Sequence, residues 1–221
     1  MKKVIAIDGP SGAGKSTIAK RIAELTGFAF LDTGALYRAI ALGLLHHGLD
    51  EKTDISQISE TLKKISIRYE NDRVLLNDID VSTEIRDERI SHYSSVFSAL
   101  TPVREMLLDV QRNCAIGCDI VAEGRDMTTV VFPDADIKFF LTASQKVRSL
   151  RRYEQIKDNS SNITLEQIES DIAERDLRDT QRDAAPLKQA QDAILIDSSK
   201  NSIEQTVTVM MKEIKNRGLW K

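Results

Sequence analysis

The chain has 221 residues, of which 41% are hydrophobic and 29% charged, and its formal net charge is −3. This is the composition of an ordinary globular protein that can bury a substantial core, in one domain or in one domain with an insertion. The slightly acidic balance gives no argument for binding to nucleic acid or to a membrane surface. We therefore expect neither partner.

Other features favour a cytoplasmic protein. No apolar run approaches the length needed to span a bilayer, and an apolar segment begins at Val4, which leaves no room for a signal peptide. Cys114 and Cys118 are the only cysteines, and together with the three histidines they form no metal-binding pattern. We expect reduced thiols, as is usual in the cytoplasm.

A glycine-rich stretch follows the first apolar run, residues 4–7, and precedes helical periodicity at Ile18, Ile22 and Leu25. Strand, glycine-rich turn and helix form the context in which a P-loop occurs. The stretch consists of Gly9, Pro10, Ser11, Gly12, Ala13, Gly14, Lys15, Ser16 and Thr17, and it contains the pattern G-x-x-x-x-G-K-[ST].

The chemistry of this pattern is phosphate binding. Glycines let backbone N–H groups converge on phosphate oxygens, and the helix N-terminus adds partial positive charge. Lys15 can reach the β- and γ-phosphates, and the Ser16 hydroxyl can ligate Mg²⁺. We predict a site for a nucleoside triphosphate and Mg²⁺.

Short apolar runs recur along the chain and are separated by helical segments. They occupy residues 4–7, 28–31, 120–122, 137–141 and 193–196. Runs of this kind are typical of parallel strands that are buried on both faces. We predict an α/β protein with the P-loop NTPase fold: a five-stranded parallel sheet flanked by helices, with ligands beyond the carboxyl ends of the strands.

The turn after the second run starts a helix for which Asp32 is a suitable N-cap. Tyr37 and Arg38 lie in the first turns of this helix, where an arginine can face a bound phosphate. Capping alone would also explain Asp32 and Thr33, and this alternative stays open at this point.

The middle of the chain changes character. Apolar and polar residues alternate over residues 65–70, a polar pair follows, and Val74 and Leu76 continue the alternation, which predicts a hairpin. A short third strand is expected at Ile79 and Val81. We interpret residues 65–100 as an antiparallel insertion that ends in a serine-rich helix, and Pro102 as the start of the next helix.

Two capping patterns mark the next helices. Thr142 with Gln145 predicts a capping box for a helix that carries several arginines, and Thr164 with Gln167 predicts a second box after the polar break at residues 157–162. We interpret residues 153–182 as a hinged helical lid.

In the second of these helices, Arg175, Asp179 and Arg182 have the spacing of one helical stripe. A solvated face with salt bridges is the simpler explanation of such a stripe. We favour a functional role, because a P-loop enzyme needs cations over the phosphoryl group that it transfers.

Three classes of P-loop protein compete. A regulatory GTPase would need an N-K-x-D guanine reader, which the sequence lacks, and a motor or transporter ATPase is not indicated at this size. A small-molecule kinase needs an acceptor pocket and an arginine-bearing lid, and the insertion and the lid are candidates for both. We therefore favour a kinase.

Four segments make the prediction more specific: residues 9–17, 31–38, 123–134 and 174–187. With these motifs in order, the whole chain closely resembles the bacterial cytidylate kinases. The resemblance implies transfer of the γ-phosphoryl group of ATP to CMP or dCMP, which gives CDP or dCDP and ADP, in pyrimidine nucleotide metabolism.

The resemblance also implies roles for individual residues. Thr33 and Arg38 match residues that hold the acceptor phosphate, with Asp32 and Tyr37 beside them, and Arg125 matches a further phosphate contact. Contacts to the cytosine edge are matched by Ser95, Arg104 and Asp126. Arg175 and Asp179 match residues near the sugar hydroxyls, and Arg182 matches a residue that reaches the phosphates. Lys15, Arg125 and Arg182 are the implied catalytic residues.

A carboxylate is a suitable reader of cytosine, because it can accept from the N4 amine, whereas uracil has a carbonyl at that position. The chain departs from the usual family pattern at Thr33, Glu123 and Thr128, where serine, aspartate and glycine are more common. A hydroxyl and an acid are retained, so we expect activity. Whether Asp8, Asp32 or Glu123 supports Mg²⁺ stays open.

We expect one P-loop kinase domain with a core of residues 1–64, 101–152 and 183–221, the NMP-binding insertion and the lid. A monomer is the default expectation. The alternatives are a kinase for another monophosphate, such as UMP or AMP, and a nucleotide-gated binding protein that has no acceptor.

Overall fold

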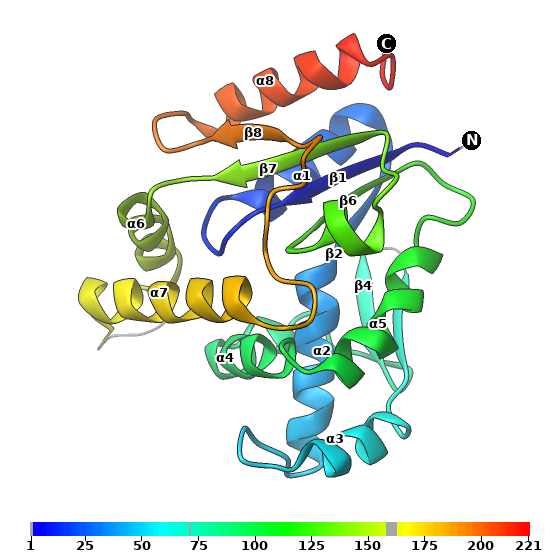
Figure 1. The fold of residues 1–221 in the computed structure, drawn as a ribbon, viewed down its shortest axis with the longest axis vertical. Helices are drawn as coiled ribbons and strands as arrows, with labels where there is room; N and C mark the ends of the chain where they lie inside the picture. The colour runs from blue at the N-terminus through cyan, green and yellow to red at the C-terminus, as the bar shows by residue number, and fades with distance from the viewer. Residues whose placement is uncertain (1, 71, 158–162) are drawn as a thin grey trace.

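The computed structural model describes residues 2–70, 72–157 and 163–221 (Figure 1). Its centre is a five-stranded parallel sheet, as predicted. In sheet order the strands are β2 (Ala29–Asp32), β6 (Ile120–Gly124), β1 (Val4–Asp8), β7 (Ile137–Thr142) and β8 (Ile194–Asp197). Each predicted run forms one strand, and β1 lies in the middle with its carboxyl end at the P-loop.

Helices cover both faces of this sheet. Successive side chains of a strand point in opposite directions, so the apolar residues of the central strand have to be buried on both faces. Ile5 and Ile7 pack with α1 (Lys15–Thr26) and α8 (Ile203–Asn216), whereas Ala6 packs with α2 (Thr33–His46) and α5 (Thr101–Asn113). Figure 1 accordingly shows α8 above the sheet and α2 with α5 below it. Leu25, which shares the predicted helical spacing of Ile18 and Ile22, is 39% exposed near the end of α1.

The insertion forms the predicted antiparallel sheet. Its elements, together with the helix that precedes them, are α3 (Ile55–Leu62), β3 (Ile67–Glu70), β4 (Arg73–Leu76), β5 (Ile79–Asp80), the 3₁₀ turn η1 (Glu84–Arg86) and α4 (Glu88–Phe97). Val74, Leu76 and Ile85 belong to the same buried cluster as the apolar face of α2. The insertion is therefore anchored on α2, the helix that starts at Asp32.

The remaining helices, α6 (Gln145–Ile156) and α7 (Leu165–Gln181), have a small core of their own, formed by Ile156, Ile168 and Ile172. The capping box at Thr164 is confirmed. The box at Thr142 is wrong, because Thr142 still pairs with β8 as the last residue of β7, and Ser144 caps α6 instead. The predicted break between these helices falls at residues 157–162, of which 158–162 lie outside the described residues.

The predicted stripe on α7 also needs a correction. Arg175 and Asp179 lie on the helix, but α7 ends at Gln181, and Arg182 has an extended backbone with φ −63° and ψ 143°. The chain then turns back at Ala185, and the Leu187 N–H donates to the Asp179 carbonyl at 2.7 Å. Arg182 is thus positioned by a turn and not by helical periodicity. Over the described residues, no helix is long and apolar enough to cross a membrane.

Candidate active site

The P-loop connects β1 to α1 and borders a cavity of about 670 Å³. Gly14 has φ 93°, a conformation that side chains disfavour, and a Cβ on Gly9 would lie 1.9 Å from the carbonyl oxygen of Leu141. Residues 11–17 all line the cavity. The loop therefore presents its backbone to the cavity, as a phosphate site requires.

Two arginines of α6 contact carbonyl groups of this loop. Arg148 donates to the Ser11 carbonyl at 3.0 Å, and Arg151 donates to the Ala13 carbonyl at 3.3 Å. Arg148 also pairs with Asp176 on α7 at 2.7 Å. Since loop carbonyls point toward these arginines, the arginines fix the loop conformation and also connect it to α7.

Lys15 is 5% exposed, and its ammonium group donates to the Pro10 carbonyl at 2.9 Å. Burial, together with the positive charges of Arg125 and Arg175, lowers the pKa of Lys15 to about 7. A phosphate at this position would oppose both effects. The surplus of positive charge is thus a property that favours an anion.

Of the three carboxylates considered for Mg²⁺, Asp8 is fully engaged by the protein. It accepts from the backbone N–H groups of Met127 and Thr128, both at 2.8 Å, and from the Thr128 hydroxyl at 2.6 Å. Burial nevertheless raises the pKa of Asp8 to about 6. Asp8 therefore anchors the π-helical turn η2 (Met127–Val131), which the sequence did not predict.

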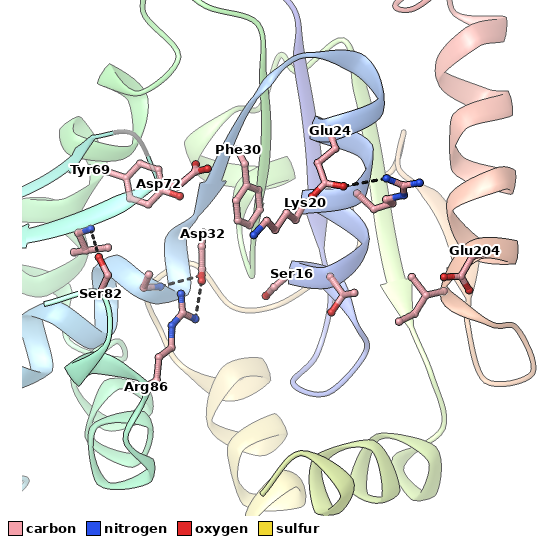
Figure 2. A pocket seen from close by; sticks show the side chains of 15 residues that line it. Ser16, Lys20, Glu24, Phe30, Asp32, Tyr69, Asp72, Ser82, Arg86 and Glu204 are labelled. Carbon is pink, nitrogen blue, oxygen red and sulfur yellow. Dashed lines mark hydrogen bonds and ion pairs between the residues drawn. The ribbon is translucent and has the colours of Figure 1, made fainter. Parts of the chain in front are cut away.

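Asp32 is also engaged, by the cap that was predicted and by two arginines. Its carboxylate accepts from the Ala35 N–H at 2.9 Å, from Arg38 at 3.1 Å and from Arg86 at 3.2 Å. Burial alone would raise the pKa of Asp32, but the two guanidinium groups outweigh burial and lower it. Figure 2 shows Arg86 reaching Asp32 at the edge of a neighbouring hollow of about 580 Å³.

Glu123 lies at the carboxyl end of β6 and accepts from the Ser16 hydroxyl at 2.5 Å. Burial raises the pKa of Glu123, and the nearby charge of Asp32 adds to this shift. No set of three or more acidic, histidine or cysteine side chains within the described chain is arranged to hold a metal alone. The Ser16 hydroxyl and the Glu123 carboxylate are oxygen groups of the kind that Mg²⁺ prefers, so the pair fits this ion.

The predicted base readers Ser95, Arg104 and Asp126 are buried, and the last two are paired with each other. Arg104 and Asp126 form a salt bridge, and Arg104 also donates to the Ser98 carbonyl at 3.0 Å. The Arg104 guanidinium lies 5.3 Å from the centre of the Tyr37 ring. Burial raises the pKa of Tyr37 to about 12, which keeps its phenol neutral.

Arginines from three parts of the chain converge on Asp179. Arg125 donates to its carboxylate at 2.8 Å, and a nitrogen of Arg182 lies 3.7 Å away. Burial would raise the pKa of Asp179, but Arg125, Arg175 and Arg182 outweigh burial and lower it. Within the described chain, buried nitrogens of Arg38, Arg175 and Arg182 have no hydrogen-bond partner. These free donors suit phosphate or sugar oxygens.

The structure brings most of the predicted residues together, in two groups. Asp32, Arg38, Glu123, Arg125 and Arg175 line the same cavity as the P-loop. The second group lies outside the lining of that cavity: Thr33, Tyr37, Ser95, Arg104, Asp126, Asp179 and Arg182. Thr33 donates to the Glu123 carbonyl at 2.7 Å, so part of its hydrogen-bonding capacity is used internally.

Two arginines near the site were not predicted. Arg86 follows the buried Ile85 in a short 3₁₀ turn, and no pattern in the sequence indicates that it reaches Asp32. Arg178 donates to the Ser95 hydroxyl at 2.7 Å. Its position three residues after Arg175 would have placed it on the same face of α7, which is the signal that could have identified it.

Comparisons with known proteins bear on the fold and the family of the chain. A solved structure described as an uncharacterized protein from Eubacterium ventriosum matches with a TM-score of 0.53 at 12% identity. The match covers 98% of this chain and 99% of that chain, and it supports the fold alone. A protein named Cytidylate kinase from Thermodesulfovibrio yellowstonii is 48% identical over 97% of this chain and 98% of its own length. Another protein of that name, from Thermosipho melanesiensis, is 42% identical over 96% of this chain and 97% of its own length.

The sequence profile of the family described as Cytidylate kinase matches residues 5–216. The match includes the P-loop, the insertion, the helices α6 and α7 and the strand β8. Together with the two relatives, this match shows that the chain belongs to the cytidylate kinase family.

Proposed function

We propose that the cavity beside the P-loop is a two-substrate site in which the donor and acceptor phosphates meet. As a member of its family, the chain is a nucleoside monophosphate kinase, which transfers the γ-phosphoryl group of ATP to CMP or dCMP. The observation that carries the assignment to this cavity is its lining. Residues 11–17 and the arginines Arg38, Arg125 and Arg175 border the same space.

On the donor side, residues 9–17 bind the phosphates of ATP, and Lys15 reaches the β- and γ-phosphates. Ser16 and Glu123 support Mg²⁺, since Asp8 and Asp32 are held by other partners. When bound, Mg²⁺ would neutralise charge on the phosphates during the transfer. Glu123 is thus our choice among the three carboxylates, and it remains a proposal.

On the acceptor side, Arg38 and Arg125 bind the phosphate of CMP, with Thr33 and Tyr37 beside them. Asp32 caps α2 and orients Arg38 through its ion pair, so capping and function coincide. For the rest of the acceptor we propose the roles that follow from the family pattern. Ser95, Arg104 and Asp126 read the base, Arg175 and Asp179 hold the sugar, and Arg182 reaches the phosphates.

The reaction needs little covalent chemistry from the protein. The acceptor is a phosphate monoester that is largely ionised near neutral pH, so no general base is required. Catalysis comes from alignment and from positive charge on Lys15, Arg125 and Arg182 around the transferring group. Residues 153–182 act as a lid over residues 65–100 and exclude water when closed, which limits hydrolysis of ATP.

Free nucleotides are thus the expected partners, and nucleic acid is not. We propose a monomer that works in the cytoplasm, where its substrates are. Size-exclusion chromatography with light scattering tests the monomer, and a mass of twice the 24.8 kDa chain would contradict it.

A coupled ADP-release assay across CMP, dCMP, UMP and AMP tests the proposed function. We expect turnover with CMP and dCMP that exceeds turnover with UMP and AMP. A preference for UMP or AMP would indicate the alternative kinases. ADP release that does not depend on any acceptor would contradict a kinase altogether and favour a nucleotide-gated binding protein.

A further inference from the structure

Ser95 and Arg178 connect the two parts of the molecule that must act together, the base-reading helix α4 and the lid helix α7. Ser95 is 4% exposed on α4, and its hydroxyl oxygen lies 2.7 Å from a guanidinium nitrogen of Arg178 on α7. Arg178 is held from the other side by Glu174, at 3.3 Å. The contact is therefore a defined hydrogen bond between two helices.

The direction of this bond is fixed by chemistry. A guanidinium group has five donors and no acceptor, so the Ser95 oxygen must accept. The bond is charge-assisted and so is stronger than a bond between neutral groups. Among the hydrogen bonds of the described chain, the Ser95 hydroxyl takes part only in this one and donates none. Its proton is thus directed away from Arg178 and is free for another partner.

The surroundings of Ser95 connect it to the other base readers. The Ser98 hydroxyl donates to the Ser95 carbonyl at 3.0 Å, and the Ser98 carbonyl accepts from Arg104, the partner of Asp126. These contacts join α4 to the Arg104–Asp126 pair through the last turn of the helix. Ser95 thus lies on the helix whose last turn also contacts Arg104, one of the other proposed base readers.

We propose that Arg178 is a specificity-determining positioning residue: it holds Ser95 as a hydrogen-bond donor toward N3 of the pyrimidine. In cytosine N3 is an acceptor, whereas in uracil N3 carries a proton. A fixed donor at this position can form a hydrogen bond with N3 of cytosine, whereas it would face the N3–H donor of uracil and disfavour that base. Because Arg178 belongs to α7, the preference is strongest when α7 is packed on α4, which couples base selection to lid closure.

This inference rests on the proposed function, since Ser95 reads the base only if CMP is the acceptor. It goes further by assigning a role to Arg178, which touches Ser95 and not the reacting atoms. Arg178 acts here on selectivity, and the chemical step itself depends on other groups.

The test compares kcat/KM for CMP and for UMP in Arg178→Met, which removes the donors and keeps an unbranched side chain. We expect the CMP-to-UMP ratio to fall by about tenfold, the value of one lost discriminating hydrogen bond. Arg178→Lys keeps a cationic donor and should restore most of the ratio. In a Ser95→Ala background, Arg178→Met should have no further effect on the ratio, because the group that it orients is gone.

Glu88→Gln is the matched control. Glu88 pairs with Arg152 of α6 at 2.5 Å and so also connects α4 to a neighbouring helix, but this pair does not include Ser95. Its ratio should remain at the parental value. A parental ratio in Arg178→Met would overturn the inference, and so would a parallel loss of kcat/KM for both substrates or an undiminished effect in the Ser95→Ala background. Failure of the proposed function would look different, because the parental enzyme itself would then show no preference for CMP.

Discussion

The two sides of the proposed site are built from different parts of the chain. On the donor side, consecutive residues 11–17 line the cavity, and the neighbouring arginines of α6 contact loop carbonyls. On the proposed acceptor side, the candidate groups are side chains from α2, α4, α5, α7 and the segment after β6, and many of them are paired with one another.

This difference separates two kinds of function. A site made of backbone N–H groups binds any triphosphate and does not distinguish between acceptors. A site made of paired side chains can distinguish bases, because each pair fixes which groups donate and which accept. We therefore expect donor-side substitutions to reduce turnover with every acceptor, and acceptor-side substitutions to change the choice among acceptors.

The largest effect is expected at Lys15. Lys15→Ala removes a charge that the transition state needs, and kcat should fall at least about a hundredfold, on the order of 3 kcal/mol. The loss should be similar for CMP and dCMP in the ADP-release assay. Lys20→Ala is the control, since Lys20 is an exposed residue of α1 that borders only the neighbouring hollow. Near-parental turnover of Lys15→Ala would contradict the catalytic role that we assign to Lys15.

The next effect concerns Mg²⁺ and Glu123. Glu123→Gln removes the carboxylate beside Ser16, and the Mg²⁺ concentration for half-maximal rate should rise by about tenfold. Asp8→Asn is the informative comparison, because Asp8 is held by Met127 and Thr128. This substitution should leave the Mg²⁺ concentration for half-maximal rate unchanged. If Asp8→Asn shifted the Mg²⁺ requirement and Glu123→Gln did not, the two roles would have to be exchanged.

The pH dependence of ATP use gives a third test. Burial, with Arg125 and Arg175 nearby, lowers the pKa of Lys15 to about 7, so above pH 7 the free enzyme increasingly holds a neutral amine. A neutral amine attracts the triphosphate less, so kcat/KM for ATP should fall with rising pH, by a slope that approaches about tenfold per unit. Lys15→Arg, which stays charged, should lack this fall. A flat profile for the parental enzyme between pH 7 and pH 9 would contradict the assignment.

The smallest effect is expected at the buried Thr128, and it concerns the stability of the fold. The Thr128 hydroxyl donates to Asp8 at 2.6 Å in a buried position, so Thr128→Ala should lower the free energy of unfolding by about 1–3 kcal/mol. Thr128→Ser keeps the hydroxyl and should retain most of the stability. Denaturant unfolding measures both. Equal stability of Thr128→Ala and the parent would show that the bond contributes nothing.

Much of the fold could be predicted because local patterns and tertiary structure agree. The five apolar runs, the hairpin of the insertion and the capping box at Thr164 all depend on neighbouring residues, and all are confirmed. At Thr142 two interactions competed. A capping box was possible, but pairing of Thr142 with Asp197 extended β7 and moved the cap to Ser144.

The site was less predictable where long-range pairing decides the role of a side chain. The P-loop and Asp32 were identified from local motifs, whereas the partners of Asp32 come from α2 and from η1. Arg182 follows a turn beyond α7, which helical spacing cannot describe. The Ser95–Arg178 bond joins residues 83 positions apart, so only the packing of α4 on α7 reveals it.

The most direct test of the difference between the two sides is the kinetics of Asp126→Asn, which keeps the size of a buried acceptor-side residue and removes its charge. The measurement is kcat/KM for CMP and for UMP, together with KM for ATP. We predict that the CMP-to-UMP ratio falls toward 1 while KM for ATP stays at the parental value. An unchanged ratio, or a rise in KM for ATP with no change in the ratio, would contradict the separation of base selection from phosphate binding.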